Sequence, residues 1–183
     1  MTTSLLARTL RLGLPLTAAL AVAACSGTSS GGNSGGGGNG GQKHVPGTVI
    51  ETRSGPVGTY LTDGSGRALY LWAKDPANSS VCSGACLGAW PALVVKGTLT
   101  TSGQAVSSDL GTITRKDGSK QVTYKGHALY YFAGDSAAGM LTGQDSPSFG
   151  AKWFLVSPTG TAITKAVPAG ATASNSGGPG AWG

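Results

Sequence analysis

The chain has 183 residues, of which 11% are charged and 39% hydrophobic, and it contains 32 glycines. Such a low charged fraction and so much glycine exclude a coiled coil, since coiled coils are rich in Glu, Lys, Arg and Leu. The formal net charge of +6 includes Arg8 and Arg11 at the start of the chain. The remaining basic residues are not clustered as binding to nucleic acid requires, so we expect no nucleic-acid partner. The length fits one domain with flanking segments.

Residues 1–24 have the features of a secretory signal peptide. Arg8 and Arg11 precede an uncharged, mostly apolar run at residues 12–24, which is too short to span a bilayer as a helix. The run ends in Val-Ala-Ala before Cys25, and small residues before a cysteine resemble the lipobox of bacterial lipoproteins. The alternative is an ordinary secreted protein that is cut at an Ala-x-Ala site.

The lipobox resemblance implies that the Cys25 thiol accepts a diacylglyceryl group, with palmitate among the acyl chains, and becomes the new N-terminus. Two acyl chains anchor a protein much more stably than one. We therefore expect the protein at the extracytoplasmic face of a bacterial cell membrane, with the membrane as its first partner.

Residues 25–44 are expected to form a flexible tether behind the lipid. Residues 26–42 hold 9 glycines, and most of the others are Ser, Thr and Asn. Such a run cannot bury enough surface to offset its backbone entropy, and its root-mean-square span is roughly 20–25 Å. Residues 169–183 are similarly small and polar, and we expect them to form a disordered tail.

Residues 45–168 form the expected ordered domain, which contains an internal repeat. The segment Gly66–Asp75 recurs as Gly126–Asp135 with six of ten positions identical, and such similarity indicates a duplication. Turn residues punctuate short apolar runs, and no segment has a sustained helical period. We therefore predict an all-β fold: a single domain of two tandem, pseudo-symmetric antiparallel β repeats around one core, at about residues 57–95 and 112–157.

Some strands can be placed from local patterns. The segments Thr112–Arg115 and Gln121–Tyr124 flank an Asp117-Gly118 turn and predict a hairpin. Two further segments are apolar on both faces, which favours central positions in their sheets; they are Ala68–Trp72 and Ala128–Phe132. The remaining strand candidates are Leu93–Val95 and Trp153–Val156.

The repeated segments also resemble a known family. Tyr70-x-Trp72-x-x-Asp75 and Tyr130-x-Phe132-x-x-Asp135 are similar to the Tyr-x-(Phe/Trp/Tyr)-x-x-Asp motif of a predicted-lipoprotein family of secreted repeats. In the first repeat, the pair Cys82 and Cys86 and the Trp-Pro segment Ala89–Leu93 resemble further features of that family. The resemblance covers roughly residues 59–156. It implies related folds and a surface location but no reaction, because the family has no established function.

The motif residues have a structural interpretation. Tyr70 and Trp72 are two residues apart and therefore lie on one face of a strand, as do Tyr130 and Phe132. Asp75 and Asp135 follow where each strand ends, where a carboxylate can accept backbone N–H bonds and fix a turn. The alternatives are a ligand or cation contact, or an acid/base pair like that of a glycosidase. That pair needs carboxylates of unlike pKa, and two equivalent Asp residues supply no reason for a difference. We therefore expect no catalytic residue and no enzymatic activity.

The two cysteines of the first repeat are the other candidate site. With Cys25 lipidated, Cys82 and Cys86 are an even pair outside the cytoplasm, where a disulfide is the expected state. The alternative is a copper or thiol redox site, because soft thiolates favour copper(I). His127 is the only histidine inside the domain and would be its third ligand. Otherwise we expect no cofactor and no metal.

Aromatic residues are numerous for a small domain. They either fill the core, in a chain with few leucines, or line a surface that binds carbohydrate or peptide. They are Trp72, Trp90, Trp153, Tyr60, Tyr70, Tyr124, Tyr130 and Tyr131. The sequence thus predicts a lipid-anchored, non-catalytic binding or structural module whose partner is an unknown cell-surface protein or glycan. The alternative is an extracytoplasmic copper-binding or electron-transfer accessory protein.

Overall fold

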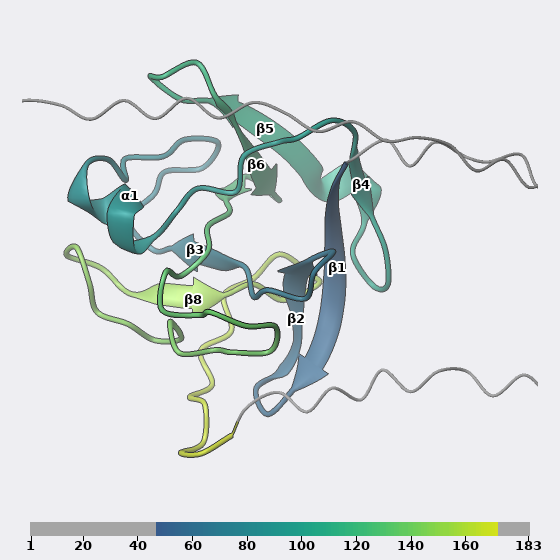
Figure 1. Ribbon diagram of the computed structural model, residues 1–183, viewed down its shortest axis with the longest axis vertical. Coiled ribbons are helices and arrows are strands. Elements are labelled where there is room, and N and C mark those ends of the chain that lie inside the picture. The colour runs from purple at the N-terminus through teal and green to yellow at the C-terminus, as the bar shows by residue number, and fades with distance from the viewer. Residues whose placement is uncertain (1–46, 172–183) are drawn as a thin grey trace, which may run out of the picture. The chain divides into compact units, whose positions relative to one another are not determined.

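The computed structural model describes residues 47–171 (Figure 1). The predicted signal peptide, Cys25, the tether and residues 172–183 of the predicted tail lie outside the described residues. The strands are β1 Thr48–Gly55, β2 Gly58–Asp63, β3 Tyr70–Trp72, β4 Leu99–Thr101, β5 Leu110–Thr114, β6 Lys120–Tyr124, β7 His127–Ala128 and β8 Trp153–Leu155; the helical turns are α1 Ala85–Ala89 and a 3-10 turn at Ser107–Asp109. The prediction of an all-β fold is confirmed. In this part of the chain, no helix has the length and apolarity that crossing a membrane requires.

The strands form three small sheets, with the orders β2-β1-β4, β3-β8 and β5-β6-β7. All pairs are antiparallel except β1 with β4. The repeated segments meet at their tyrosines: the Tyr70 N–H donates to the Tyr130 carbonyl, and the Tyr130 N–H donates to the Tyr70 carbonyl, both at 2.9 Å. Because the two bonds are reciprocal, the repeats are related by a pseudo-twofold axis that passes between these residues.

The last extended segment of each repeat lies in the sheet of the other repeat. β8, from the second repeat, pairs with β3 of the first, and Figure 1 shows these distant strands side by side. Just beyond β8, the Val156 carbonyl accepts a bond from the Leu61 N–H at 2.8 Å. The equivalent residue of the first repeat, Leu93, accepts from the Val122 N–H at 2.8 Å and donates to the Leu129 carbonyl at 2.9 Å. Neither repeat therefore completes its sheet alone.

Local predictions have mixed outcomes. The hairpin at Asp117-Gly118 is confirmed as β5 and β6, with Gly118 at a φ of +82° that favours glycine. The predicted strand at residues 93–95 is wrong in detail. That segment makes only isolated bridges, at Ala92 with Tyr130 and at Val94 with Gln121, because it passes from one partner strand to the next. The helix α1 was not predicted, since a single turn is too short to produce a helical period.

The interior consists of two apolar clusters rather than the single core predicted. Tyr70 and Trp72 enter one cluster, and Leu69 and Leu71 enter the other. Successive side chains of a strand point to opposite faces, so a strand that is apolar throughout contributes to both clusters. Its counterpart divides in the same way, with Ala128 and Tyr130 in the first cluster and Leu129 in the second. Both segments therefore bury residues on both faces, but the predicted central positions are wrong: β3 lies in a two-stranded sheet, and β7, the only strand in the second segment, is an outer strand.

Three stacked tryptophan rings and a tilted phenylalanine ring form the centre of the first cluster, and we call them the aromatic column: Trp72, Trp153, Trp90 and Phe132. Successive ring centroids are 5.0, 4.0 and 4.5 Å apart. The rings come alternately from the first and the second repeat. The three tryptophans are at most 4% exposed, so they belong to the core and offer no open ring face on which a sugar could stack.

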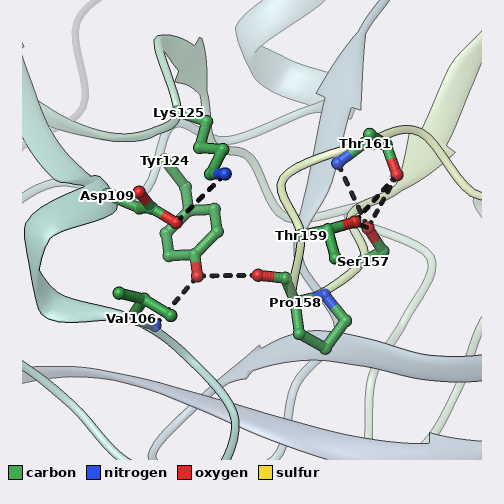
Figure 2. A network of polar contacts seen from close by, with 8 residues as sticks. All are labelled: Val106, Asp109, Tyr124, Lys125, Ser157, Pro158, Thr159 and Thr161. Atoms are coloured by element: carbon green, nitrogen blue, oxygen red, sulfur yellow. Dashed lines mark hydrogen bonds and ion pairs between the residues drawn. The ribbon is translucent and has the colours of Figure 1, made fainter.

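Tyr124 anchors a separate polar network beside the second cluster (Figure 2). Its hydroxyl accepts a bond from the Val106 N–H and donates one to the Pro158 carbonyl, both at 2.9 Å. Lys125 forms an ion pair with Asp109 at 3.6 Å. The turn after β8 is closed by hydroxyl contacts among Ser157, Thr159 and Thr161. The network holds the segment between the repeats against the end of the second repeat.

We expect the two repeats to unfold together. Replacing Trp153 by alanine in the second repeat should lower the free energy of unfolding by about 3–5 kcal/mol, because it empties the middle of the aromatic column. In this variant the amide hydrogens of β3, in the first repeat, should exchange faster than in the wild type, as should those of β6 in the second repeat. Phe149→Ala, at a residue that is 40% exposed, is the control and should change stability by no more than about 0.5 kcal/mol. Separate unfolding transitions for the two repeats would contradict the exchanged-strand arrangement.

Candidate functional site

The tyrosine of each motif bonds to the aspartate of the other motif. The Tyr70 hydroxyl donates to Asp135 Oδ2 at 2.5 Å, and the Tyr130 hydroxyl donates to Asp75 Oδ2. The two phenols also pack edge-on against the aromatic column, Tyr70 against Trp90 and Tyr130 against Trp153. The motif thus joins the two repeats, which sequence reasoning missed because it considered each motif within its own strand.

The second oxygen of each aspartate holds the loop that follows its strand. Asp75 Oδ1 accepts the Val81 N–H at 2.8 Å. Asp135 Oδ1 accepts the Thr142 N–H at 2.9 Å and the Thr142 hydroxyl at 2.5 Å. Each carboxylate therefore accepts a backbone N–H bond from the loop that follows its strand. Both oxygens of each carboxylate accept bonds from within the domain.

Burial is the largest cause of the pKa shifts of Tyr70, Tyr130 and Asp75. Burial raises the pKa of the Tyr70 phenol, and the neighbouring Asp135 raises it further. Burial also raises the pKa of Tyr130, helped by its hydrogen bond to Asp75. The pKa of Asp75 is raised by burial, although its bond from Tyr130 acts in the opposite direction. Both tyrosines are therefore protonated donors at neutral pH.

Cys82 and Cys86 are joined by a disulfide, with Cα atoms 5.4 Å apart. Both residues are buried, and the small loop between them passes through Gly84 at a φ of +55°. Disulfide sulfurs are not thiolates, so the pair in this state has no ligand for copper(I). His127 lies in β7, and within residues 47–171 no three His, Cys, Asp or Glu side chains gather as a metal site.

A cavity of about 710 Å³ lies between the loop that carries this disulfide and the β5–β6 hairpin. We call it the hairpin cavity; residues 78–83 and Leu87 line one wall and residues 113–117 the other. Serine, threonine and asparagine residues line these walls together with the apolar Val81 and Ile113 and the charged Arg115, Lys116 and Asp117. Sequence reasoning did not predict this cavity, because the two walls are distant in sequence and belong to different repeats.

Arg115 connects the two walls of the hairpin cavity. Its Nη2 donates to the Cys82 carbonyl at 2.6 Å, and its Nη1 donates to Ser80 Oγ at 3.0 Å and to Gln121 Oε1. Ser80 Oγ in turn lies 2.6 Å from the Tyr130 hydroxyl. The cavity walls are therefore fixed to the motif cluster by a continuous chain of hydrogen bonds.

Comparison with known proteins identifies both halves of the domain. A family model described as a secreted repeat of unknown function matches residues 51–94 and again residues 111–157. The resemblance seen in the sequence is thereby confirmed. Neither the curated proteins nor the solved structures contain a significant match to the chain.

The Tyr70–Asp135 bond should make stability fall at alkaline pH. The folded-state pKa of Tyr70 is raised above its ordinary value of 10.0, so the unfolded chain loses its proton first, and the free energy of unfolding declines above about pH 10. In Tyr70→Phe this decline should be smaller. The variant should also lose about 1–3 kcal/mol at pH 7, since it leaves the buried Asp135 Oδ2 without its donor.

Denaturant titrations at pH 7 and in the alkaline range measure both effects. Tyr124→Phe is the matched control, because its hydroxyl contacts only the Val106 N–H and the neutral Pro158 carbonyl. Its loss should be smaller, about 0.5–1.5 kcal/mol. An equal decrease in the free energy of unfolding for the two variants would show that the bond to Asp135 stabilises the fold no more than the hydroxyl bonds of Tyr124 do.

Proposed function

We propose that the protein is lipid-anchored and that its domain binds a partner outside the cell and catalyses no reaction. The match of both repeats to a family model described as a secreted repeat of unknown function supports a location outside the cell. A diacylglyceryl group on Cys25 anchors it to the extracytoplasmic face of the bacterial cell membrane. The glycine-rich residues 26–42 hold the domain clear of the headgroups.

The hairpin cavity is the observation that carries the binding role. A volume of about 710 Å³ is within the range of ligand sites. Its walls are held by Arg115 and by the disulfide, so little conformational entropy is lost when a partner binds. The partner is a cell-surface protein or a glycan.

The absence of catalysis is supported by how the motif carboxylates are used. Asp135 is only 2% exposed, and Asp75 is bonded to Tyr130 and to the backbone of Val81. A general acid or base must reach its substrate directly or through one water molecule. The role of both carboxylates in this proposal is to join the repeats and fix their loops.

The alternative function, copper delivery or electron transfer through Cys82, Cys86 and His127, requires the disulfide to open. Reduction would yield two thiolates on one short loop, a ligand type that suits copper(I). No contact in residues 47–171 brings His127 to these sulfurs, so the binding role is the better supported of the two.

Mass spectrometry of the mature protein under non-reducing conditions tests the anchor and the copper alternative together. The N-terminal peptide should begin at Cys25 with the added mass of a diacylglyceryl group. The peptide that holds Cys82 and Cys86 should lack two hydrogens and should be unaffected by copper(I). An unmodified Cys25 would refute the anchor. Copper(I) that binds the reduced protein tightly, and is lost in Cys82→Ser, would favour the alternative.

A cavity-filling variant tests the binding role. Val81 lines the hairpin cavity and is 49% exposed, so Val81→Trp should fit on the surface while it blocks the entrance. We expect the detergent-solubilised protein to be retained by intact cells, and Val81→Trp to lower its affinity by about tenfold or more. Val106→Trp is the matched control, since Val106 is 46% exposed and does not line the cavity. Pretreatment of the cells with protease or glycosidase separates a protein partner from a glycan. Equal retention of both variants would exclude this cavity as the binding site.

A further inference from the structure

One wall of the hairpin cavity ends in a free strand edge. β5 is the outer strand of the sheet β5-β6-β7. The Arg115 N–H donates to the Ser119 carbonyl at 2.9 Å, and hydrogen-bonded residues alternate along an antiparallel pair. The N–H and C=O groups of Thr114 therefore point away from β6. Within the described residues they have no backbone partner.

The hairpin cavity extends around this edge. Ile113 and Arg115 lie on one face of the strand, while the Thr114 side chain lies on the opposite face. All three residues line the same cavity. Because β6 covers the other edge of β5, and because Lys116 and Asp117 of the turn also line the cavity, the cavity lies against the free edge of β5 and the turn that follows it. The outward backbone groups of Thr114 are thus open to whatever fills the cavity.

Arg115 offers a binding group beside this edge. No carboxylate in residues 47–171 lies within ion-pair distance of its guanidinium group. Three of its five N–H donors point to Ser80, Cys82 and Gln121. The Nε–H and one Nη2–H remain, and neighbouring N–H groups of a guanidinium match the two oxygens of a carboxylate. The three internal bonds hold this fork in place before any ligand arrives.

The surroundings favour an acidic ligand with apolar side chains. Arg115 and Lys116 line the cavity and outnumber Asp117 there, which itself bonds to Ser119. Asp75, on which the charge of Arg115 also acts, is already bonded to Tyr130 and to the Val81 N–H. Val81 and Ile113 supply apolar contact area on the facing walls. A peptide strand that pairs with β5 places every second side chain on the face that carries Ile113 and Arg115.

We propose that the hairpin cavity binds an extended acidic peptide of a partner protein. The peptide adds a strand to the free edge of β5 and places a Glu or Asp carboxylate on the Arg115 fork. This inference rests on the proposed function, since it names the kind of partner that the binding module takes. A polyanionic glycan carries carboxylates but no regular ladder of N–H and C=O groups, so it would leave Thr114 unpaired.

Synthetic peptides test the proposal on the mature full-length protein in detergent. The probes are acetyl-(Val-Glu)3-amide and its counterparts with Gln or Lys in place of Glu, and binding is measured by calorimetry. We expect the Glu peptide to bind at least tenfold more tightly than the Gln peptide, and the Lys peptide not to bind. Thr114→Pro should weaken the Glu peptide tenfold or more, because proline lacks the N–H that the strand needs. Thr114→Ala keeps this N–H and should bind as wild type does.

Arg115→Lys tests the fork separately. Lysine keeps the charge but not the bidentate geometry, so this variant should reduce the preference for Glu over Gln to less than threefold. The near-ultraviolet circular dichroism of each variant shows whether its fold is intact. Thr114→Pro keeps the Arg115 side chain and is compared with Thr114→Ala, so it still decides the question if Arg115→Lys unfolds.

Each of the following results would overturn the proposal. The first is equal affinity for the Glu and Lys peptides, and the second is a Thr114→Pro variant that binds the Glu peptide as well as Thr114→Ala does. The third is binding of polygalacturonate without binding of any peptide, which would assign the cavity to glycans. If no peptide binds while Val81→Trp still releases the protein from cells, the acidic peptide is excluded and the proposed function stands.

Discussion

The structure depends on the exchange of the last segment between the two repeats. Because β8 completes the sheet of the first repeat, and the segment around Leu93 joins strands of the second, each half supplies what the other lacks. The alternating rings of the aromatic column follow from this exchange. Trp90 and Trp153 lie on the exchanged segments, and their rings stack 4.0 Å apart at the centre.

The exchange also explains the structural role of the Tyr-x-aromatic-x-x-Asp motif. A tyrosine on one repeat and an aspartate on the other come together only when both segments are in place. The Tyr70–Asp135 pair is buried next to the aromatic column and the Tyr130–Asp75 pair is partly buried there, so water competes less for these hydrogen bonds than it would at the surface. The two Tyr–Asp bonds can therefore form only when both repeats are folded and paired. The bonds are equivalent because the repeats are related by a pseudo-twofold axis.

The proposed binding site arises where this symmetry fails. Only the first repeat has the cysteine pair, and its disulfide shapes the loop that faces the β5–β6 hairpin. Arg115 comes from the second repeat and bonds to the Cys82 carbonyl of the first. The hairpin cavity thus combines a feature unique to one repeat with a strand edge of the other.

The sequence alone determined the class of fold, the duplication, the hairpin at Asp117-Gly118 and the family, because these follow from local periodicity, turn residues and repeated motifs. The burial of Ala68–Trp72 on both faces also followed from its unbroken apolar pattern. Only the tertiary structure decided that Tyr70 bonds to Asp135 rather than within its own motif, and that Arg115 faces Ser80 across a cavity. Two similar repeats can form their sheets separately or exchange segments, and both arrangements have the same local sequence pattern. The exchanged arrangement brings the rings of the aromatic column together, and such contacts between residues distant in sequence cannot be read from local periodicity.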